Sequence, residues 1–139
     1  MVSLRTHHVG ITVSDLERAV DFYGDVLGLS VESRFSVSGD AFATGVGVDG
    51  ASARFAHLEA GGALVELVEY EPAGTARSSA TINQPGSTHL GFLVDDIARF
   101  YADLPESLET ISEPQTTESG STILFFTDPD GTLIEVLER

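Results

Sequence analysis

The chain has 139 residues, of which 42% are hydrophobic, and its 22 acidic residues outnumber seven basic ones to give a formal net charge of −15. This size and composition suit one globular core and exclude a disordered protein. The negative charge repels nucleic acids and anionic membranes, which excludes both as partners. The absence of cysteine excludes disulfides, thiolate nucleophiles and iron–sulfur clusters, so any metal must be held by imidazole and oxygen ligands.

Two further features bear on location. No apolar stretch approaches the ~20 residues that span a bilayer. The opening MVSLRTHHVG lacks the charged and then apolar plan of a signal peptide. We therefore expect a cytoplasmic protein with a single domain over residues 1–139.

The first half of the chain reads as a strand, a helix and three strands. Residues 4–13 form an apolar, β-branched run typical of a strand. Residues 14–17 (SDLE) have the form of a capping box, apolar residues then recur at helical spacing, and Gly28 favours a helix end. A glycine-rich stretch separates the first two of the remaining strands, which are expected at 29–37, 54–59 and 63–70.

The second half repeats this order after a linker over 71–87 that is rich in Pro, Gly, Ala, Ser and Thr. A strand at 88–94 precedes a helix that starts near Asp96 and ends before Pro105. The turn residues DPDG (128–131) join the last two strands. The later strands are expected at about 108–112, 121–127 and 132–138.

The two halves are copies of one module. HHVGITVSDLERAV (7–20) aligns with THLGFLVDDIARFY (88–101), which places His8 over His89. GALVELVE (62–69) aligns with GTLIEVLE (131–138), which places Glu66 over Glu135. Two matches in the same order indicate an internal duplication. The chain is therefore predicted to have an α+β fold of two βαβββ modules, each with a sheet buried beneath its helix, covering about 4–70 and 88–139.

Four repeated residues do not fit an ordinary surface or core. Side chains alternate along a strand, so His8 and His89 are expected on the sheet face away from the helices. Glu66 and Glu135 stand among apolar neighbours in strands that are apolar on both faces and therefore buried. An ionised carboxylate there costs several kcal/mol unless it is paired or bound to a cation.

A shared metal ion accounts for all four residues at once. A pseudo-two-fold pairing of the modules would bring two imidazoles and two carboxylates together and leave one or two coordination positions open for catalysis. The sequence therefore predicts one divalent metal ion, Zn, Ni, Co or Mn, held by His8, Glu66, His89 and Glu135.

Four other acidic or imidazole side chains are assigned no part in this site. His7 and His57 have no counterpart in the repeat and are expected to be structural or exposed. Glu69 and Glu138 do repeat, but they lie near strand ends with opposite parity to the predicted ligands. We expect them to be solvated strand edges.

The motifs together resemble the vicinal oxygen chelate superfamily, which includes glyoxalase I and methylmalonyl-CoA epimerase. The segments that carry the resemblance are HHVGITVSDLERAVDFYGDVLGL, LVELVEY, THLGFLVDD and DPDGTLIEV. They cover almost the whole chain outside 36–53 and 71–87. The resemblance implies paired modules that form a cup-shaped mixed sheet around one metal, with the helices on the outer face and the four ligands named above. A homodimer is expected.

Within this family, a substrate binds through neighbouring oxygens on the metal, which makes the adjacent C–H acidic. A carboxylate at the metal then moves the proton as general base and acid. By resemblance, Glu135 or Glu66 would take this role in a lyase or isomerase acting on a small α-oxo, α-hydroxy or acyl compound. Glutamate at position 66 is similar to glyoxalase I, whereas the flanking VELVEYEP looks closer to the epimerase-like branch.

Two alternative functions stay open. An extradiol-type dioxygenase would use His8, His89 and Glu135 as a two-His-one-carboxylate Fe(II) site, and Glu66 would then have no role. A non-enzymatic binding protein of the bleomycin-resistance kind would sequester a ligand, but such proteins typically lack the metal ligands that are present here.

Overall fold

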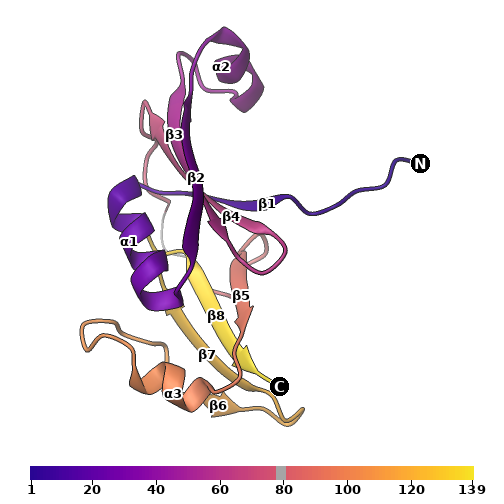
Figure 1. The fold of residues 1–139 in the computed structure, drawn as a ribbon, viewed down its shortest axis with the longest axis vertical. Coiled ribbons are helices and arrows are strands. Elements are labelled where there is room, and N and C mark those ends of the chain that lie inside the picture. Colours follow the sequence, from indigo (N-terminus) through magenta and orange to yellow (C-terminus); the bar gives the residue numbers. More distant parts are fainter. Residues whose placement is uncertain (78–80) are drawn as a thin grey trace. The chain divides into compact units, whose positions relative to one another are not determined.

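Two four-stranded sheets organise the computed structural model, one in each of its two units, Met1–Ala76 and Arg77–Arg139. The structure describes residues 1–77 and 81–139 (Figure 1). Residues 78–80 of the predicted linker 71–87 lie outside the described residues. Among the described residues, no helix has the length and apolar character needed to cross a membrane.

Each unit follows the βαβββ order that the sequence predicts, with one additional helix, α2, in the first unit. The first contains β1 (His8–Thr12), α1 (Leu16–Leu27), β2 (Ser30–Val37), α2 (Asp40–Val46), β3 (Ser52–Glu59) and β4 (Leu64–Glu71). The second contains β5 (His89–Leu93), α3 (Ile97–Ala102), β6 (Gln115–Thr116), β7 (Thr122–Thr127) and β8 (Leu133–Glu138). The strand orders β1-β4-β3-β2 and β5-β8-β7-β6 match each other, and in both sheets the first pair is parallel and the others antiparallel. The predicted α+β fold of two similar modules is confirmed.

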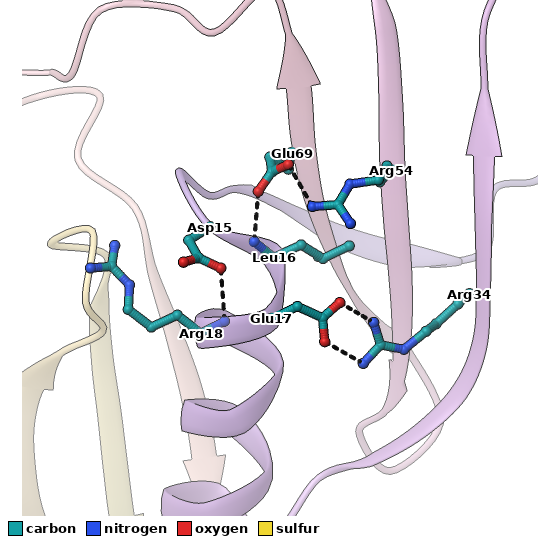
Figure 2. Close-up of polar contacts among 7 residues, drawn as sticks. All are labelled: Asp15, Leu16, Glu17, Arg18, Arg34, Arg54 and Glu69. Atoms are coloured by element: carbon teal, nitrogen blue, oxygen red, sulfur yellow. Dashed lines mark hydrogen bonds and ion pairs between the residues drawn. The ribbon is translucent and has the colours of Figure 1, made fainter.

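Helix α1 begins at an aspartate cap. Asp15 has extended backbone angles, and its Oδ1 accepts a hydrogen bond from the backbone N–H of Arg18 at 3.0 Å. Glu69 on β4 accepts from the N–H of Leu16 at 2.9 Å, while Glu17 is turned to Arg34, 2.7 Å away (Figure 2). The predicted capping box was therefore wrong in detail, because the cap is one residue later and the glutamate that completes it comes from a distant strand.

Helix α3 begins in the same way. Asp96 accepts from the N–H of Arg99 at 3.0 Å, and Glu138 on β8 accepts from the N–H of Ile97 at 2.8 Å. The expectation that Glu69 and Glu138 are solvated strand edges was wrong. Both are half-buried and satisfy a backbone donor that the first turn of a helix leaves unpaired.

The core of each unit lies between its sheet and its first helix. In the first unit, α1 ends at Gly28 in the left-handed region with φ of 71°, as the sequence predicts. The least exposed side chains on this interface are Val13, Leu16, Ala19, Tyr23, Ala56, Leu58, Val65 and Leu67. Their counterparts in the second unit are Leu90, Ile97, Leu124, Phe126, Ile134 and Val136.

Two segments differ from the prediction. The glycine-rich stretch after β2 contains α2, bracketed by Gly39 and Gly47 at positive φ. Its Phe42 packs against a buried cluster, Ala53, Phe55 and Val68, on the sheet face away from α1.

The strand expected at 108–112 was wrong. Only Thr110 forms an isolated bridge, to Phe126, and the paired strand β6 lies further along the chain. The turn predicted at 128–131 is confirmed, because the carboxylate of Asp128 accepts from the N–H groups of Asp130 and Thr132, each at 2.9 Å.

Candidate metal centre

The first unit brings one predicted histidine and one predicted glutamate together. β1 and β4 are parallel, and their register sets Gly10 opposite Glu66, so His8 lies on the same face two residues earlier. The Nε2 of His8 is 3.5 Å from Oε1 of Glu66. A Cβ atom on Gly10 would lie 3.8 Å from both side chains, so glycine keeps the space beside them open.

The second unit repeats this pair. Gly91 lies opposite Glu135 in the parallel register of β5 and β8. The Nε2 of His89 is 3.2 Å from Oε2 of Glu135. The histidine side chains are 38% and 35% exposed and the glutamate side chains 15% and 18%, so both pairs can be reached from one open face of their sheet.

The structure thus gathers the four predicted ligands as two His–Glu pairs, one in each unit. Neutral imidazole and carboxylate are donors that suit Zn, Ni, Co, Mn or Fe(II). Within residues 1–77 and 81–139, no group of three or more such side chains has the arrangement of a metal site by itself. Convergence of both pairs on one ion therefore stays a prediction.

His57 also contacts Glu66, although the sequence predicts no part for His57 in the metal site. The antiparallel register of β3 and β4 sets it opposite Glu66, and its Nε2 is 2.6 Å from Oε2 of the carboxylate. An ionised carboxylate only accepts hydrogen bonds, so the imidazole is the donor. The two oxygens of Glu66 therefore face different histidines, Oε1 towards His8 and Oε2 towards His57.

A signal for this pairing was present in the sequence. Gly61 and Gly62 form a two-residue hairpin loop with φ of 77° and 108°, closed by a hydrogen bond from the N–H of Ala60 to the carbonyl of Ala63. Two adjacent glycines are typical of such loops, because both positions need positive φ. Counting pairs outward from this loop places residue 57 opposite residue 66.

His7 contacts the back of the His8 ring. The two Nδ1 atoms are 2.8 Å apart, which leaves Nε2 of His8 facing the glutamate. Histidines that bind metal usually hydrogen-bond through their other ring nitrogen, and this contact sets the ring orientation. The alignment places Thr88 opposite His7, so the second unit has no imidazole at this place.

Aromatic side chains lie next to His57 in the first unit and next to His89 in the second. The Phe35 ring meets His57 edge-on with centroids 5.0 Å apart and stacks on Phe55 at 4.8 Å. In the second unit, Phe125 lies 5.4 Å from His89. Each unit therefore has aromatic ring surface near its candidate ligands.

The remaining repeated glutamate of the first unit has a structural role. Arg54 Nη2 is 2.7 Å from Oε2 of Glu69 (Figure 2). This hydrogen bond, followed by the one from the N–H of Leu16, holds the pKa of Glu69 below its ordinary value of 4.5. The same carboxylate raises the pKa of Arg54. Glu69 is therefore an ionised group committed to the start of α1.

Comparison with known proteins places the chain in a family. The model of the glyoxalase/bleomycin resistance protein/dioxygenase superfamily matches residues 5–136. A 2-epi-5-epi-valiolone epimerase from Actinomyces sp is 28% identical over 97% of this chain and 79% of its own length. The uncharacterized protein YaeR of Escherichia coli K12 is also 28% identical, over 97% of this chain and 96% of its own length.

A solved structure gives the same result. A glyoxalase family protein from Bacillus cereus superposes with a TM-score of 0.86 at 25% identity, covering 99% of this chain and 95% of its own. The chain belongs to the glyoxalase/bleomycin resistance protein/dioxygenase superfamily, as its motifs indicate.

Proposed function

We propose that this protein is a metal-dependent isomerase or lyase that moves a proton on a carbon next to a carbonyl or hydroxyl group. The observation that carries the proposal is the repeated His–Glu pair, with nitrogen–oxygen distances of 3.5 Å in the first unit and 3.2 Å in the second. Family membership and the similarity to an epimerase support a proton-transfer reaction.

The proposed ligands are His8, Glu66, His89 and Glu135, contributed by both units of one chain or by two chains of a homodimer. A divalent metal ion bound there would act as a Lewis acid on neighbouring substrate oxygens and make the adjacent C–H acidic. A glutamate carboxylate would take this proton and return it, a transfer that typically contributes about 10²–10⁴-fold to the rate. Glu135 suits this role better than Glu66, because Glu66 is also bonded to His57.

The surroundings favour a small and uncharged substrate class. Phe35, beside His57, and Phe125, beside His89, offer apolar ring surface. A chain of net charge −15 with no lysine provides few cationic contacts for a phosphate or a polyanionic carrier. We therefore propose a small α-oxo or α-hydroxy compound as substrate.

The test is the metal content of purified protein, measured by mass spectrometry without chelators or nickel columns. We expect about one equivalent of Zn, Ni, Co or Mn per chain, because two His–Glu pairs complete one site. The double variant Glu66→Gln, Glu135→Gln should lose it. The matched control is Glu69→Gln, Glu138→Gln, which changes two glutamates that cap helices and should retain the metal.

Each other result points to a different function. Bound iron would favour the dioxygenase alternative. Protein that neither contains nor takes up a divalent metal would contradict the proposal and favour ligand sequestration. If metal is present, candidate substrates are incubated in D₂O, and deuterium appearing at the α-carbon identifies the proton that the enzyme moves. Light scattering of the metal-loaded protein shows whether the site needs one chain or two.

A further inference from the structure

His57 makes the chemical environment of Glu66 different from that of Glu135. It is opposite Glu66 in the register of β3 and β4. The residue opposite Glu135 in the register of β7 and β8 is Phe125. The two modules thus have the same pair of candidate ligands but a different side chain next to each glutamate.

The contact between His57 and Glu66 is short and largely buried. The Nε2–Oε2 distance is 2.6 Å, and the two side chains are only 12% and 15% exposed. Hydrogen bonds to charged groups at this distance are among the strongest in proteins, and partial burial shields this one from competing water. Phe35 covers one edge of the His57 ring at 5.0 Å, which restricts the imidazole to its place opposite the carboxylate.

The two oxygens of the Glu66 carboxylate have different partners. Oε2 is taken by His57, and Oε1 is the oxygen that faces His8, 3.5 Å from its Nε2. Glu66 is therefore held with one oxygen presented to the other candidate ligand. At the corresponding position on β7, Glu135 lies opposite Phe125, whose ring offers no hydrogen-bond donor.

We infer that His57 is a positioning residue that orients Glu66 for metal binding in the first module only. The inference rests on the proposed function, because it needs a metal at the His–Glu pairs. His57 acts through the carboxylate and is not itself counted among the ligands. Partners that orient metal ligands in this way typically change metal affinity about 10–100-fold when they are removed.

The test measures Co²⁺ affinity by competition with a coloured chelator, for the full-length wild type and three variants of His57. His57→Phe gives the first module the side chain that the second module has. His57→Gln places an amide nitrogen close to where Nε2 stands and keeps the donor. His57→Asn is equally polar, but its shorter side chain withdraws the donor from the carboxylate.

We expect His57→Phe and His57→Asn to bind Co²⁺ about 10–100-fold more weakly than the wild type. His57→Gln should remain within a few-fold of it. In a Glu66→Gln background, His57→Phe should cause no further loss, because the residue acts only through that glutamate. Urea unfolding of each metal-free variant shows that it is folded, and the Gln–Asn comparison still decides the question if His57→Phe does not fold.

The possible results distinguish failure of the His57 inference from failure of the proposed function. A wild type that binds about one Co²⁺, together with His57→Asn of unchanged affinity, overturns the inference and leaves the proposed function standing. Equal losses in His57→Gln and His57→Asn also overturn it, because the imidazole would then be needed for itself. A wild type that binds no Co²⁺ overturns the proposed function and the inference with it.

Discussion

The two modules have the same glutamates but different partners for them. In the first module, Glu66 is bonded to His57 and Glu69 to Arg54. In the second module, the residues in register with the corresponding Glu135 and Glu138 are Phe125 and Thr122. Both sheets carry the two carboxylates, but the middle strand places a basic residue opposite each of them in the first sheet and Phe125 and Thr122 opposite them in the second.

This difference shows that a carboxylate and its environment can diverge separately in a duplicated fold. The backbone register that sets Glu66 beside β1 is repeated for Glu135 beside β5. The neighbouring strand supplies the partner, and that strand is free to vary because one substitution there leaves the register intact. Among the described residues, Glu66 is thus contacted by two histidines and Glu135 by one.

The largest expected effect comes from removing the charge of a proposed ligand. Glu66→Gln and Glu135→Gln should each weaken Co²⁺ binding strongly. The loss should exceed the factor of about 10–100 that is typical when a residue supporting a metal ligand is removed. The loss should be greater at Glu66, because His57 has already restricted its carboxylate to one orientation and less entropy is lost on binding. Chelator competition measures both. Equal losses at the two positions would remove the distinction between the modules.

The next effect concerns the caps of α1 and α3. Glu69→Ala and Glu138→Ala each leave a helix N–H unpaired, which typically costs about 1 kcal/mol of unfolding free energy. The cost should be higher for Glu69→Ala, since that change also leaves Arg54 without its partner. Urea unfolding at pH 7 compares them. A Glu138→Ala variant that is the more destabilised would show that Arg54 contributes nothing to the first cap.

A smaller effect should appear as a dependence on pH. The pKa of Glu69 is lowered in the folded chain, first by Arg54, so its stabilising contribution is complete above the ordinary value of 4.5 and is lost as the pH falls through the lowered value. Arg54→Thr reproduces the residue found in the second module. It should lower the urea midpoint at pH 7 and match the wild type once Glu69 is protonated in both.

The experiment for Arg54→Thr is urea unfolding at pH 7 and at steps below pH 4.5. The reciprocal variant Thr122→Arg should show the opposite sign, with a gain at pH 7 that disappears in acid. A difference between Arg54→Thr and the wild type that persists at the lowest pH would mean that the arginine stabilises the fold by packing and not through the charge of Glu69.

The smallest effect is expected at the exposed ion pair of Glu17 and Arg34. The side chains are 61% and 43% exposed, so solvent screens the pair in spite of its 2.7 Å distance. The alignment places Ala98 opposite Glu17 in the second module. Glu17→Ala should change the unfolding free energy by less than about 0.5 kcal/mol. A larger loss in urea unfolding would indicate that this pair forms part of a network.

The sequence by itself determined the features that depend on local pattern. The repeated motifs predicted two βαβββ modules, and period-two alternation predicted that His8 and His89 share the sheet face away from the helices. The strand registers place Glu66 and Glu135 on the same face as these histidines. Glycine in the left-handed region ends α1, and aspartates begin α1 and α3. Such signals act within a few residues and can be recognised without knowing what packs against them.

Only the tertiary structure decided which distant residues meet. Glu69 reaches the N–H of Leu16 across the fold, and nothing near either residue in the chain announces the bond. For His57 and Glu66, the adjacent glycines at 61 and 62 indicate the hairpin register, and the structure adds that the two side chains meet at 2.6 Å. The comparison of the two copies identified the proposed ligands, because they occur in both. It did not identify His57, because His57 occurs in the first copy alone. A residue that distinguishes the first module from the second, as His57 does, cannot belong to the set of residues that the two modules share.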